Sequence, residues 1–358
     1  MTPQDSPRLL REFARDLITQ LVLAILVTTF VVAVTVLRSV DASEPLPALG
    51  LALVFVMALL SVAALLGFLG HIARFVRVDT MMAAVHRETR DAMEQHYLPY
   101  GHEQDRYDAP SSGADEGVLV AAGKSGFVQD LKIADLVGCA DDADALVIVG
   151  VRPGDHVVVG TPVARVVGAA QAHGAMTEAV RASITLGYER TLEGDVALGL
   201  RQLADIAVKA LSPGINDPTT AGHAIGHITD LLVRLQGRRL GPLVHFGASG
   251  KARVQTQDRD FRYYLDLVVG AIRPHAAREL LIILALLRML RDVAVGARDA
   301  EQRHEVVRQA ELVVATAPND LLQADADAVR DAHRRVDDAV NGDAAKAYGD
   351  RAGETRSL

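Results

Sequence analysis

The sequence predicts an α+β membrane protein, with a transmembrane helical hairpin near the amino terminus, a small β-module, and an α-helical cytosolic domain that carries a β-hairpin. Three observations predict this fold class. The chain of 358 residues is 50% hydrophobic with a mean hydropathy of +0.18, and its apolar excess lies in the first 70 residues. Residues 117–168 are dense in Val and Gly, in short runs separated by turns, which is typical of strands. After about residue 175 the apolar residues recur with a helical period.

Composition excludes several classes of function. Aromatic residues make up only 4% of the chain and Trp is absent, which disfavours a surface that stacks bases or sugars. A formal net charge of −8 disfavours binding to nucleic acid over the whole chain. The single cysteine, Cys139, rules out an intrachain disulfide and any Cys-rich zinc or iron–sulfur site. We therefore expect no nucleic acid partner and no cofactor.

Two uncharged runs predict two transmembrane helices within residues 17–70. The first covers 17–37, and its 21 residues match a hydrocarbon core of roughly 30 Å at about 1.5 Å per residue. The second extends from Pro45 to Gly70, with residues 51–69 as the span. A cleaved signal peptide is the alternative for the first run, but the run is longer than a usual h-region and lacks an evident small-x-small cleavage site.

Basic residues lie outside the two spans and predict their orientation. Those that precede the first span or follow the second are Arg8, Arg11, Arg15, Arg74, Arg77, Arg87 and Arg90. The connecting loop offers Arg38 against Asp41 and Glu44. By the positive-inside rule, residues 1–16 and everything after residue 71 are cytoplasmic. Neither span contains an ionisable residue, which disfavours transport through these two helices alone.

The region after the spans has a mixed pattern. We expect an amphipathic stalk helix and a linker over 71–116, because residues 99–116 are rich in Pro, Gly, Ser and charge. In the β-module of 117–168, the stretches VAAGKSGFV (120–128) and VRPGDHVVVGTPVARV (151–166) resemble the two halves of a biotinyl/lipoyl hammerhead fold. Carrier domains of that fold modify a lysine in a Met-Lys-Met type of motif, which this sequence lacks, so Lys124 is interpreted as a turn residue.

A helical domain is predicted over 175–297, around a loop with the sequence SPGINDP. The helix at 198–211 has an apolar face, with a ladder of Arg201, Asp205 and Lys209 beside it. It stops at Ser212, and the next helix begins with Asp217 as N-cap and Pro218 at its first position. That helix carries two histidines four residues apart in HAIGH, but the segment lacks the Glu of a metalloprotease helix and a nearby third ligand. We predict no metal site.

The rest of the chain is predicted to be a β-hairpin followed by helices. The hairpin covers 242–257 and turns at Ala248 to Gly250. Helices are expected at about 259–273, 275–296, 300–315 and 319–340, the last two within the C-terminal helical segment of 298–342. The apolar stretch LLIILALL at 280–287 is too short to span a bilayer and is predicted to be buried core or a subunit contact. We expect residues 343–358 to be a disordered tail.

Three stretches together resemble the bacterial membrane proteins known as domain of unknown function 2254. They are RLLREFARDLITQLVLAILVTTFVVAVTVLR (8–38), the 151–166 stretch, and LGYERTLEGDVALGLRQLADIAVKALSPGINDPTTA (186–221), within a match over about residues 6–297. The resemblance implies a multi-pass protein of the bacterial inner (cytoplasmic) membrane with a cytosolic domain. Members usually carry four spans, so the resemblance implies that the hairpin here corresponds to the second pair. Either the chain has lost the first pair or its start codon has been placed too far downstream. Thr219 departs from the family, in which an aromatic residue commonly follows the Asn-Asp-Pro.

Three functions compete at this level. The first is a non-enzymatic, membrane-anchored homo-oligomeric assembly that binds a ligand or partner, because the sequence has no G-x-S-x-G, P-loop, metalloprotease helix or dinucleotide fingerprint. The second is an enzyme or small-ligand sensor, because polar residues cluster in 190–217. The third is a channel or transporter component. The polar residues of the second hypothesis are Arg190, Thr191, Asp195, Arg201, Asp205, Ser212, Asn216 and Asp217, each of which also has an alternative as a helix cap, turn residue or surface ion pair.

Overall fold

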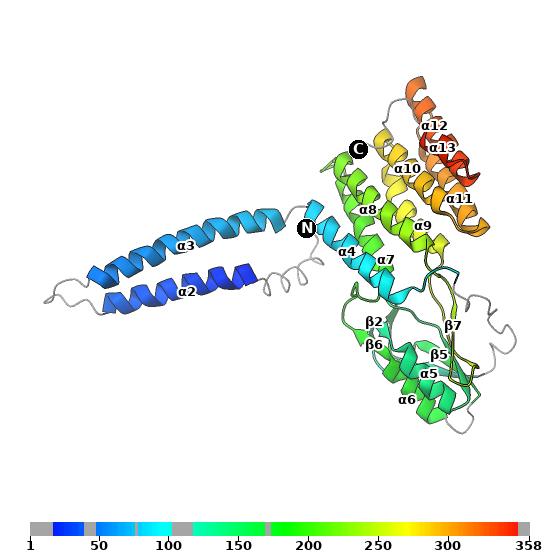
Figure 1. Ribbon diagram of the computed structural model, residues 1–358, viewed down its shortest axis with the longest axis horizontal. Helices are drawn as coiled ribbons and strands as arrows, with labels where there is room; N and C mark the ends of the chain where they lie inside the picture. Colours follow the sequence, from blue (N-terminus) through cyan, green and yellow to red (C-terminus); the bar gives the residue numbers. More distant parts are fainter. Residues whose placement is uncertain (1–16, 39–47, 76–77, 102–116, 169–172, 350–358) are drawn as a thin grey trace. The chain divides into compact units, whose positions relative to one another are not determined.

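A computed structural model describes residues 17–38, 48–75, 78–101, 117–168 and 173–349 (Figure 1). The predicted N-terminal segment 1–16, most of the predicted linker and the last part of the predicted tail lie outside the described residues. The chain divides into two compact units, residues 1–81 and 82–358, and each is described by itself.

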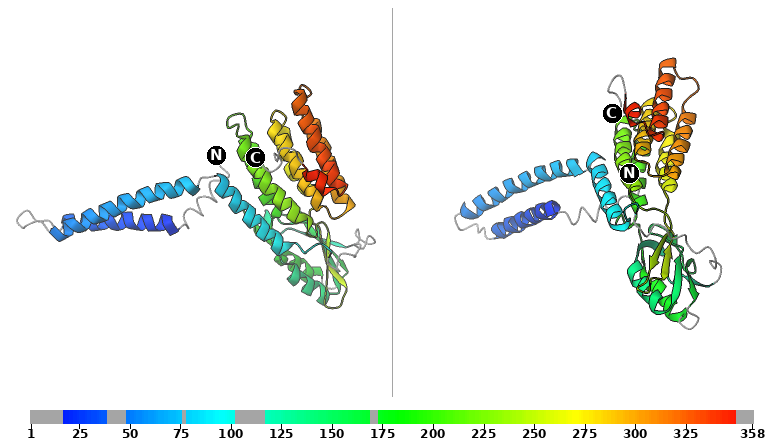
Figure 2. Two further views of the ribbon diagram at one scale, coloured as in Figure 1. Left: turned by 45° about the horizontal axis from the view of Figure 1, so that its top comes forward. Right: turned by 45° about the vertical axis from the view of Figure 1, so that its right-hand side comes forward.

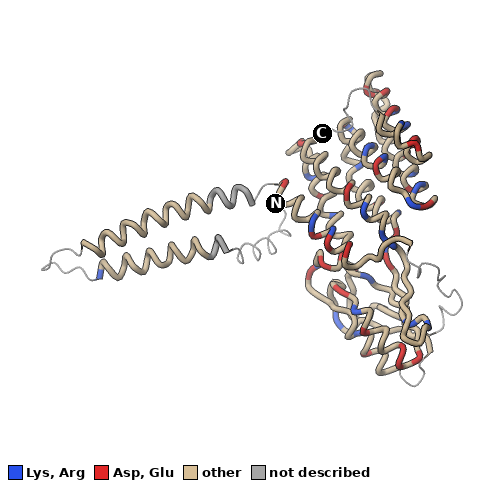
Figure 3. Tube along the Cα trace, viewed as in Figure 1, with Lys and Arg blue, Asp and Glu red and all other residues tan. Residues whose placement is uncertain are grey.

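The first unit contains two apolar helices, α2 (Leu17–Arg38) and α3 (Ala48–Phe75), which pack side by side (Figure 2). Both are long and apolar enough to cross a membrane, as the two uncharged runs predicted. Figure 3 shows these helices to be almost free of charged residues along their coloured parts, and Arg38 lies in the last turn of α2. Between the helices the Thr29 Oγ1 and Ser61 Oγ atoms lie 2.8 Å apart. A hydroxyl pair of this kind satisfies polar groups that hydrocarbon would leave unpaired.

Two sheets form the β part of the second unit. The strands are β1 (Val118–Ala121), β2 (Gly126–Leu131), β3 (Ala145–Val149), β4 (His156–Val157), β5 (Pro162–Gly168), β6 (Ile184–Gly187), β7 (Leu243–Phe246) and β8 (Ala252–Thr256). One sheet has the order β1-β5-β3-β8-β7 and the other β4-β2-β6, and among these pairings only β3–β8 is parallel. The helices α5 (Ile133–Asp142) and α6 (His173–Ser183) pack against the five-stranded sheet.

The β-module is less self-contained than the sequence pattern indicated. The hairpin predicted at 242–257 forms as β7 and β8, but it joins the sheet of the module through the parallel pairing of Val147 with Val254. This pairing covers an edge of β3 that would otherwise be open. A second difference is α5, which lies inside a region interpreted as all strand. Its apolar residues recur at helical spacing, and Leu136 and Ala140 are buried.

Helices form the other part of the second unit (Figure 1). They are α4 (Val78–His96, which belongs to this unit from residue 82 onward), α7 (Val196–Ala210), α8 (Pro218–Gln236), α9 (Phe261–Ile272), α10 (Leu280–Gly296), α11 (Ala300–Thr316), α12 (Gln323–Val340) and α13 (Ala344–Tyr348). The four helices expected after the hairpin therefore exist, with starts that differ by up to five residues. In the LLIILALL stretch, Ile282, Ile283 and Leu286 are buried in the main hydrophobic core, as one of its two interpretations predicted.

The disordered tail predicted for 343–358 is wrong in its first part. Asp343 caps α13 by accepting a hydrogen bond from the Lys346 backbone at 3.1 Å. Ala347 is fully buried, and the Tyr348 ring lies 4.5 Å from the Arg291 Cζ atom. The composition of the tail suggested that the loss of chain entropy would prevent it from folding. Burial of these residues against α12 and α10 offsets that entropy cost. Residues 350–358 lie outside the described part of the chain.

His245 on β7 makes stability depend on pH. Burial lowers its pKa below the usual 6.5, and Arg239 lowers it further. The folded state therefore binds a proton at His245 less readily than the unfolded state does. The free energy of unfolding is expected to fall as the pH decreases below about 6.5. Between about pH 7.5 and 5, the melting temperature of His245→Gln should decrease less than that of the native protein. His304→Gln, at an exposed position of α11, is the matched control and should follow the native profile.

Candidate functional site

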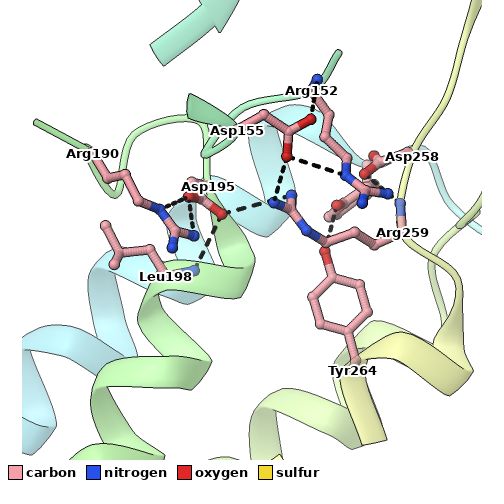
Figure 4. A network of polar contacts seen from close by, with 9 residues as sticks. Arg152, Asp155, Arg190, Asp195, Leu198, Asp258, Arg259 and Tyr264 are labelled. Atoms are coloured by element: carbon pink, nitrogen blue, oxygen red, sulfur yellow. Dashed lines mark hydrogen bonds and ion pairs between the residues drawn. The ribbon is translucent and has the colours of Figure 1, made fainter. Parts of the chain in front are cut away.

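Four separate segments bring polar side chains together at the start of α9 (Figure 4). They are the end of α4, the turn between β3 and β4, the segment before α7, and the segment from residue 258 into α9. We call this group the junction network, and its members are Tyr97, Arg152, Asp155, Arg190, Asp195, Asp258, Arg259 and Tyr264. The network lies where the sheets meet the helices of the second unit.

Asp195 makes the shortest contacts in the network. Its side chain is 2% exposed and accepts hydrogen bonds from the Arg190 Nε and Nη2 atoms at 2.8 and 2.5 Å. It also caps α7 by accepting a hydrogen bond from the Leu198 backbone at 3.2 Å. One carboxylate therefore caps a helix and pairs with a guanidinium.

Arg259 is the buried cation of the network. It is 5% exposed, and its nearest carboxylates are Asp195 at 3.7 Å and Asp155 at 3.9 Å. Burial is the largest single effect and lowers its pKa, but the negative charge of Asp195 and the contributions of Tyr264 and Tyr263 together outweigh burial, so the pKa is raised. The Cζ atoms of Arg259 and Arg152 lie 5.3 and 5.6 Å from the centroid of the Tyr263 ring, close enough for cation–π attraction.

Two tyrosines and an aspartate complete the network. The Tyr97 and Tyr264 hydroxyls lie 2.7 Å apart, and burial raises the pKa of both phenols. Burial also raises the pKa of Asp258, whose carboxylate accepts a hydrogen bond from the Arg259 backbone at 2.6 Å. Because Tyr97 directly follows α4 and Tyr264 belongs to α9, this hydroxyl pair joins the end of one helix to another.

The charges of the junction network balance, with three arginines against three aspartates. A balanced, closely packed network offers little attraction to a charged ligand and instead fixes the sheets to the helices. Gly154, in the turn between β3 and β4, has a φ of +93°, and a Cβ atom there would lie 2.2 Å from Asp195 Oδ2. Glycine at this position therefore allows the turn to approach the carboxylate.

The residues predicted as one polar pocket lie in three places. Arg190 and Asp195 are paired in the network, with the half-buried Thr191 between them in sequence. Arg201 and Asp205 are on the exposed face of α7. Ser212, Asn216 and Asp217 lie beyond the other end of α7, whose 15 residues correspond to about 22 Å. The structure thus brings together only the first group.

The loop after α7 uses its polar residues locally. Ser212 donates a hydrogen bond to the Lys209 carbonyl at 2.7 Å. Asn216 has a φ of +46°, a conformation that Asn tolerates better than most residues. Asp217 caps α8 by accepting a hydrogen bond from the Thr220 backbone at 3.0 Å, and the Thr220 hydroxyl lowers the pKa of this carboxyl. These contacts account for the SPGINDP loop by helix capping.

Sequence reasoning missed Arg152, Asp155, Asp258 and Arg259. Arg152 and Asp155 flank a Pro-Gly turn that the sequence pattern explained without a further role. The signal for the other two was the DRD run at 258–260, where three charged residues immediately precede an apolar helix. One of the three is the α9 cap, Asp260, which accepts a hydrogen bond from the Tyr263 backbone at 2.7 Å. Helix capping needs only this one residue, so it leaves Asp258 and Arg259 without a local explanation.

A cleft opens beside the network, between the starts of α9 and α11. Its volume is about 110 Å³, and we call it the α9–α11 cleft. It is lined by Tyr100, Arg238, Leu240, Asp260, Phe261, Arg262, Asp299, Glu301, Gln302 and Glu305. Charged groups of both signs therefore surround one small space.

Two buried side chains of α11 reach the cleft with unused polar atoms. Gln302 is 6% exposed, and its Oε1 atom accepts a hydrogen bond from the Arg298 backbone at 2.8 Å. Its side-chain nitrogen donates to no residue in the described part of the chain. Glu305 is 4% exposed and accepts a hydrogen bond from Arg308 at Oε2, 2.7 Å away. Its Oε1 atom lies 3.7 Å from Arg262 Nη1, too far for a hydrogen bond.

The two histidines of HAIGH do not assemble a metal site with other described residues. The His227 ring lies 5.1 Å from the ring of His86 on α4. His86 Nε2 is 2.8 Å from Asp230 Oδ2, and Arg234 donates to the same oxygen at 2.7 Å. Within the described ranges, no group of three or more His, Cys, Asp or Glu side chains has an arrangement that could hold a metal ion. These contacts instead join α4 to α8.

Comparison with known proteins identifies relatives over most of the chain. A family model described as a predicted membrane protein (DUF2254) matches residues 2–292. The uncharacterized protein Rv1290c of Mycobacterium tuberculosis (strain H37Rv) is 31% identical over 322 residues, which is 88% of this chain and 62% of that protein. The uncharacterized protein Mb1321c of Mycobacterium bovis has the same identity and coverage. The chain thus spans about 62% of the length of these curated relatives. No solved structure matches it.

Proposed function

The chain belongs to the DUF2254 family of predicted membrane proteins, and from this premise we propose that it is a membrane-anchored binding protein. In this proposal α2 and α3 hold the protein in the bilayer, and the second unit binds a small polar molecule in the α9–α11 cleft. The observation that carries the proposal is the cleft itself. It has a defined volume, charges of both signs, and two buried side chains with unused polar atoms.

The anchor is proposed to cross the inner membrane of a bacterium twice, with both ends of the chain in the cytoplasm. The support is the distribution of basic residues: Arg8, Arg11 and Arg15 precede the first span and Arg74 and Arg77 follow the second. The second unit would then face the cytosol, an environment that suits its unpaired Cys139.

This topology predicts how cysteines react in intact cells. Cys139 is exposed on the second unit, so a membrane-impermeant maleimide should label it only after the inner membrane of spheroplasts is broken. In a Cys139→Ser background, Ser43→Cys places a thiol in the loop between the two spans and should be labelled in intact spheroplasts. The opposite labelling of the two thiols would contradict the proposed orientation.

The binding function is tested by the thermal stability of the full chain in nanodiscs. At tenfold excess over its Kd, a ligand of the folded state stabilises it by about 1.4 kcal/mol, which corresponds to a rise in melting temperature of roughly 2–5 °C. Small amines, small carboxylates and small zwitterions form the panel, and we expect at least one of these classes to produce the rise.

Two leucine variants identify the place of binding. Leu240 lines the cleft, so the larger ring in Leu240→Trp should occupy the space and abolish the stabilisation. Leu281→Trp, at an exposed position of α10 outside the cleft, should retain it. A panel without effect on the native protein, or an equal effect on both variants, would refute binding in the cleft.

The β part of the second unit supports two finer proposals. Its strands at 118–121 and 162–168 pair antiparallel and belong to the region that resembles a hammerhead fold, which we retain as a proposed relationship. The strand β1 is an edge of its sheet and exposes Val118 and Leu119, a surface that a second copy of the chain could cover. We propose a homo-oligomer on this basis, to be measured by light scattering of the detergent-extracted protein.

A further inference from the structure

The α9–α11 cleft carries groups suited to both ends of a zwitterion. We infer that its ligand is a small molecule with one carboxylate and one ammonium group, of the size of a simple amino acid. This inference rests on the proposed binding function and specifies the chemical class of the ligand.

One set of groups lining the cleft can hold a carboxylate. Arg262 lies 3.7 Å from both Asp266 and Glu305 and donates no hydrogen bond to either, so its guanidinium retains donors for a ligand. The Gln302 side-chain nitrogen is a second donor, on a side chain that is otherwise buried and held by its Oε1 atom. Arg238 contributes further positive charge at the same cleft. Guanidinium and amide donors together are well suited to a carboxylate.

Another set of groups can hold an ammonium. Glu305 Oε1 accepts no hydrogen bond from a described residue, although Glu305 lines the cleft and is almost fully buried. Glu301 lies four residues earlier on α11, so the two carboxylates are on the same face of the helix. Glu301 is exposed and forms no ion pair with the described part of the chain. Carboxylate oxygens without donors are the natural partners of a cationic N–H group.

The remaining acidic groups of the cleft are already occupied. Asp260 caps α9, and Asp299 accepts hydrogen bonds from the Gln302 backbone at 2.8 Å and the Tyr100 hydroxyl at 3.1 Å. A count of carboxylates alone would therefore exaggerate the attraction for cations. The groups available to a carboxylate are Arg262 and the Gln302 amide. Those available to an ammonium are Glu301 and Glu305 Oε1.

The volume limits the ligand to a few atoms. An apolar cavity of about 150 Å³ holds benzene, which has six carbon atoms. In the same proportion, the 110 Å³ of the cleft suits about four to five non-hydrogen atoms, and glycine has five. A ligand this small binds weakly even when every polar group is satisfied, so we expect a Kd on the order of 1 mM.

Binding of three probes to the full chain in nanodiscs, measured by ligand-observed NMR, tests the inference. Glycine carries both charges, methylamine carries only the positive charge, and acetate carries only the negative charge. We expect glycine to bind at least tenfold more tightly than either of the others, because each single-charge probe leaves one set of cleft groups without a partner.

Two charge-neutralising variants assign the two ends of the ligand. Arg262→Gln should weaken glycine binding at least fivefold and remove its preference over methylamine. Glu301→Gln should weaken glycine binding to a similar extent and remove its preference over acetate. Both positions are exposed, so neither change is expected to prevent folding. Arg334→Gln and Glu311→Gln, at exposed positions outside the cleft, are the matched controls and should bind glycine as the native protein does.

The outcomes separate this inference from the proposed function. If methylamine or acetate binds as tightly as glycine, and the cleft variants weaken that binding, the cleft is a binding site but the zwitterion is overturned. If none of the probes binds, and no compound of the thermal-stability panel acts through Leu240, the binding function itself is overturned.

Discussion

Asp195→Ala is expected to lower the free energy of unfolding of the second unit by about 3–5 kcal/mol. The native carboxylate is buried, accepts two hydrogen bonds from Arg190 and lies 3.7 Å from the buried Arg259. Its removal leaves two guanidinium groups near each other without the negative charge between them, and the start of α7 loses its cap. Chemical denaturation of the detergent-solubilised protein, followed by circular dichroism, measures the loss.

The matched control is Asp217→Ala, because Asp217 also caps a helix. It accepts hydrogen bonds from Thr220 at the start of α8, but no buried arginine depends on it. We expect its loss of stability to be several-fold smaller than that of Asp195→Ala. Losses of equal size would mean that Asp195 acts only as a helix cap and that the junction network adds little.

A double-variant cycle measures the ion pair directly. Arg190→Met removes the partner cation, so in that background Asp195→Ala no longer leaves Arg190 unpaired. The loss in the double variant should therefore be smaller than the sum of the two single losses by about 1–3 kcal/mol. Strict additivity would contradict a direct interaction between the two side chains.

The parts of the fold that depend on local sequence could be predicted. Hydropathy alone locates α2 and α3, because a bilayer span requires about 20 uncharged residues in succession. The start of α8 could be predicted because Asp217 and Pro218 form a local cap. The pairing of β3 with β8 could not be predicted, because it joins residues more than 100 positions apart and no local pattern encodes a partner strand.

The candidate site shows the same division. Arg190 and Asp195 could be found because they lie five residues apart in a conspicuously polar segment. Their neighbour Arg259 comes from a distant segment, and the turn that carries Arg152 had a sufficient local explanation as a Pro-Gly turn. The α9–α11 cleft depends on the relative positions of two helices, a loop and Tyr100, so its lining could not be assembled from sequence spacing.

Gly199→Ala is the second substitution expected to have a large effect. Gly199 lies in α7, and a Cβ atom at this position would be 1.8 Å from the Thr89 Oγ1 atom of α4. Thr89 is fully buried, and its hydroxyl donates to the Val85 carbonyl at 2.6 Å. Rotation of the threonine side chain cannot relieve the contact, because its own Cβ atom would be only 2.8 Å away. The backbones of the two helices must therefore separate.

The expected loss is about 2 kcal/mol in the free energy of unfolding. Overpacking a buried contact costs about 1–3 kcal/mol, and a contact of 1.8 Å belongs at the upper end of that range. Alanine in a helix interior regains about 1 kcal/mol over glycine. Gly226→Ala is the control for the second term, since a Cβ atom there meets nothing within 4 Å. That variant should be as stable as the native protein or slightly more stable, and an equal loss from both would show that helix packing is not the cause.

Shortening the threonine provides a second check on the Gly199→Ala result. Thr89→Ala removes the Oγ1 and Cγ2 atoms, the first and third nearest neighbours of the added methyl group, but keeps the Cβ atom. In the Thr89→Ala background, Gly199→Ala should therefore cost about 1 kcal/mol less than it does in the native protein. If the cost is the same in both backgrounds, the contact between α4 and α7 does not limit the size of residue 199, and the close approach of these helices is refuted.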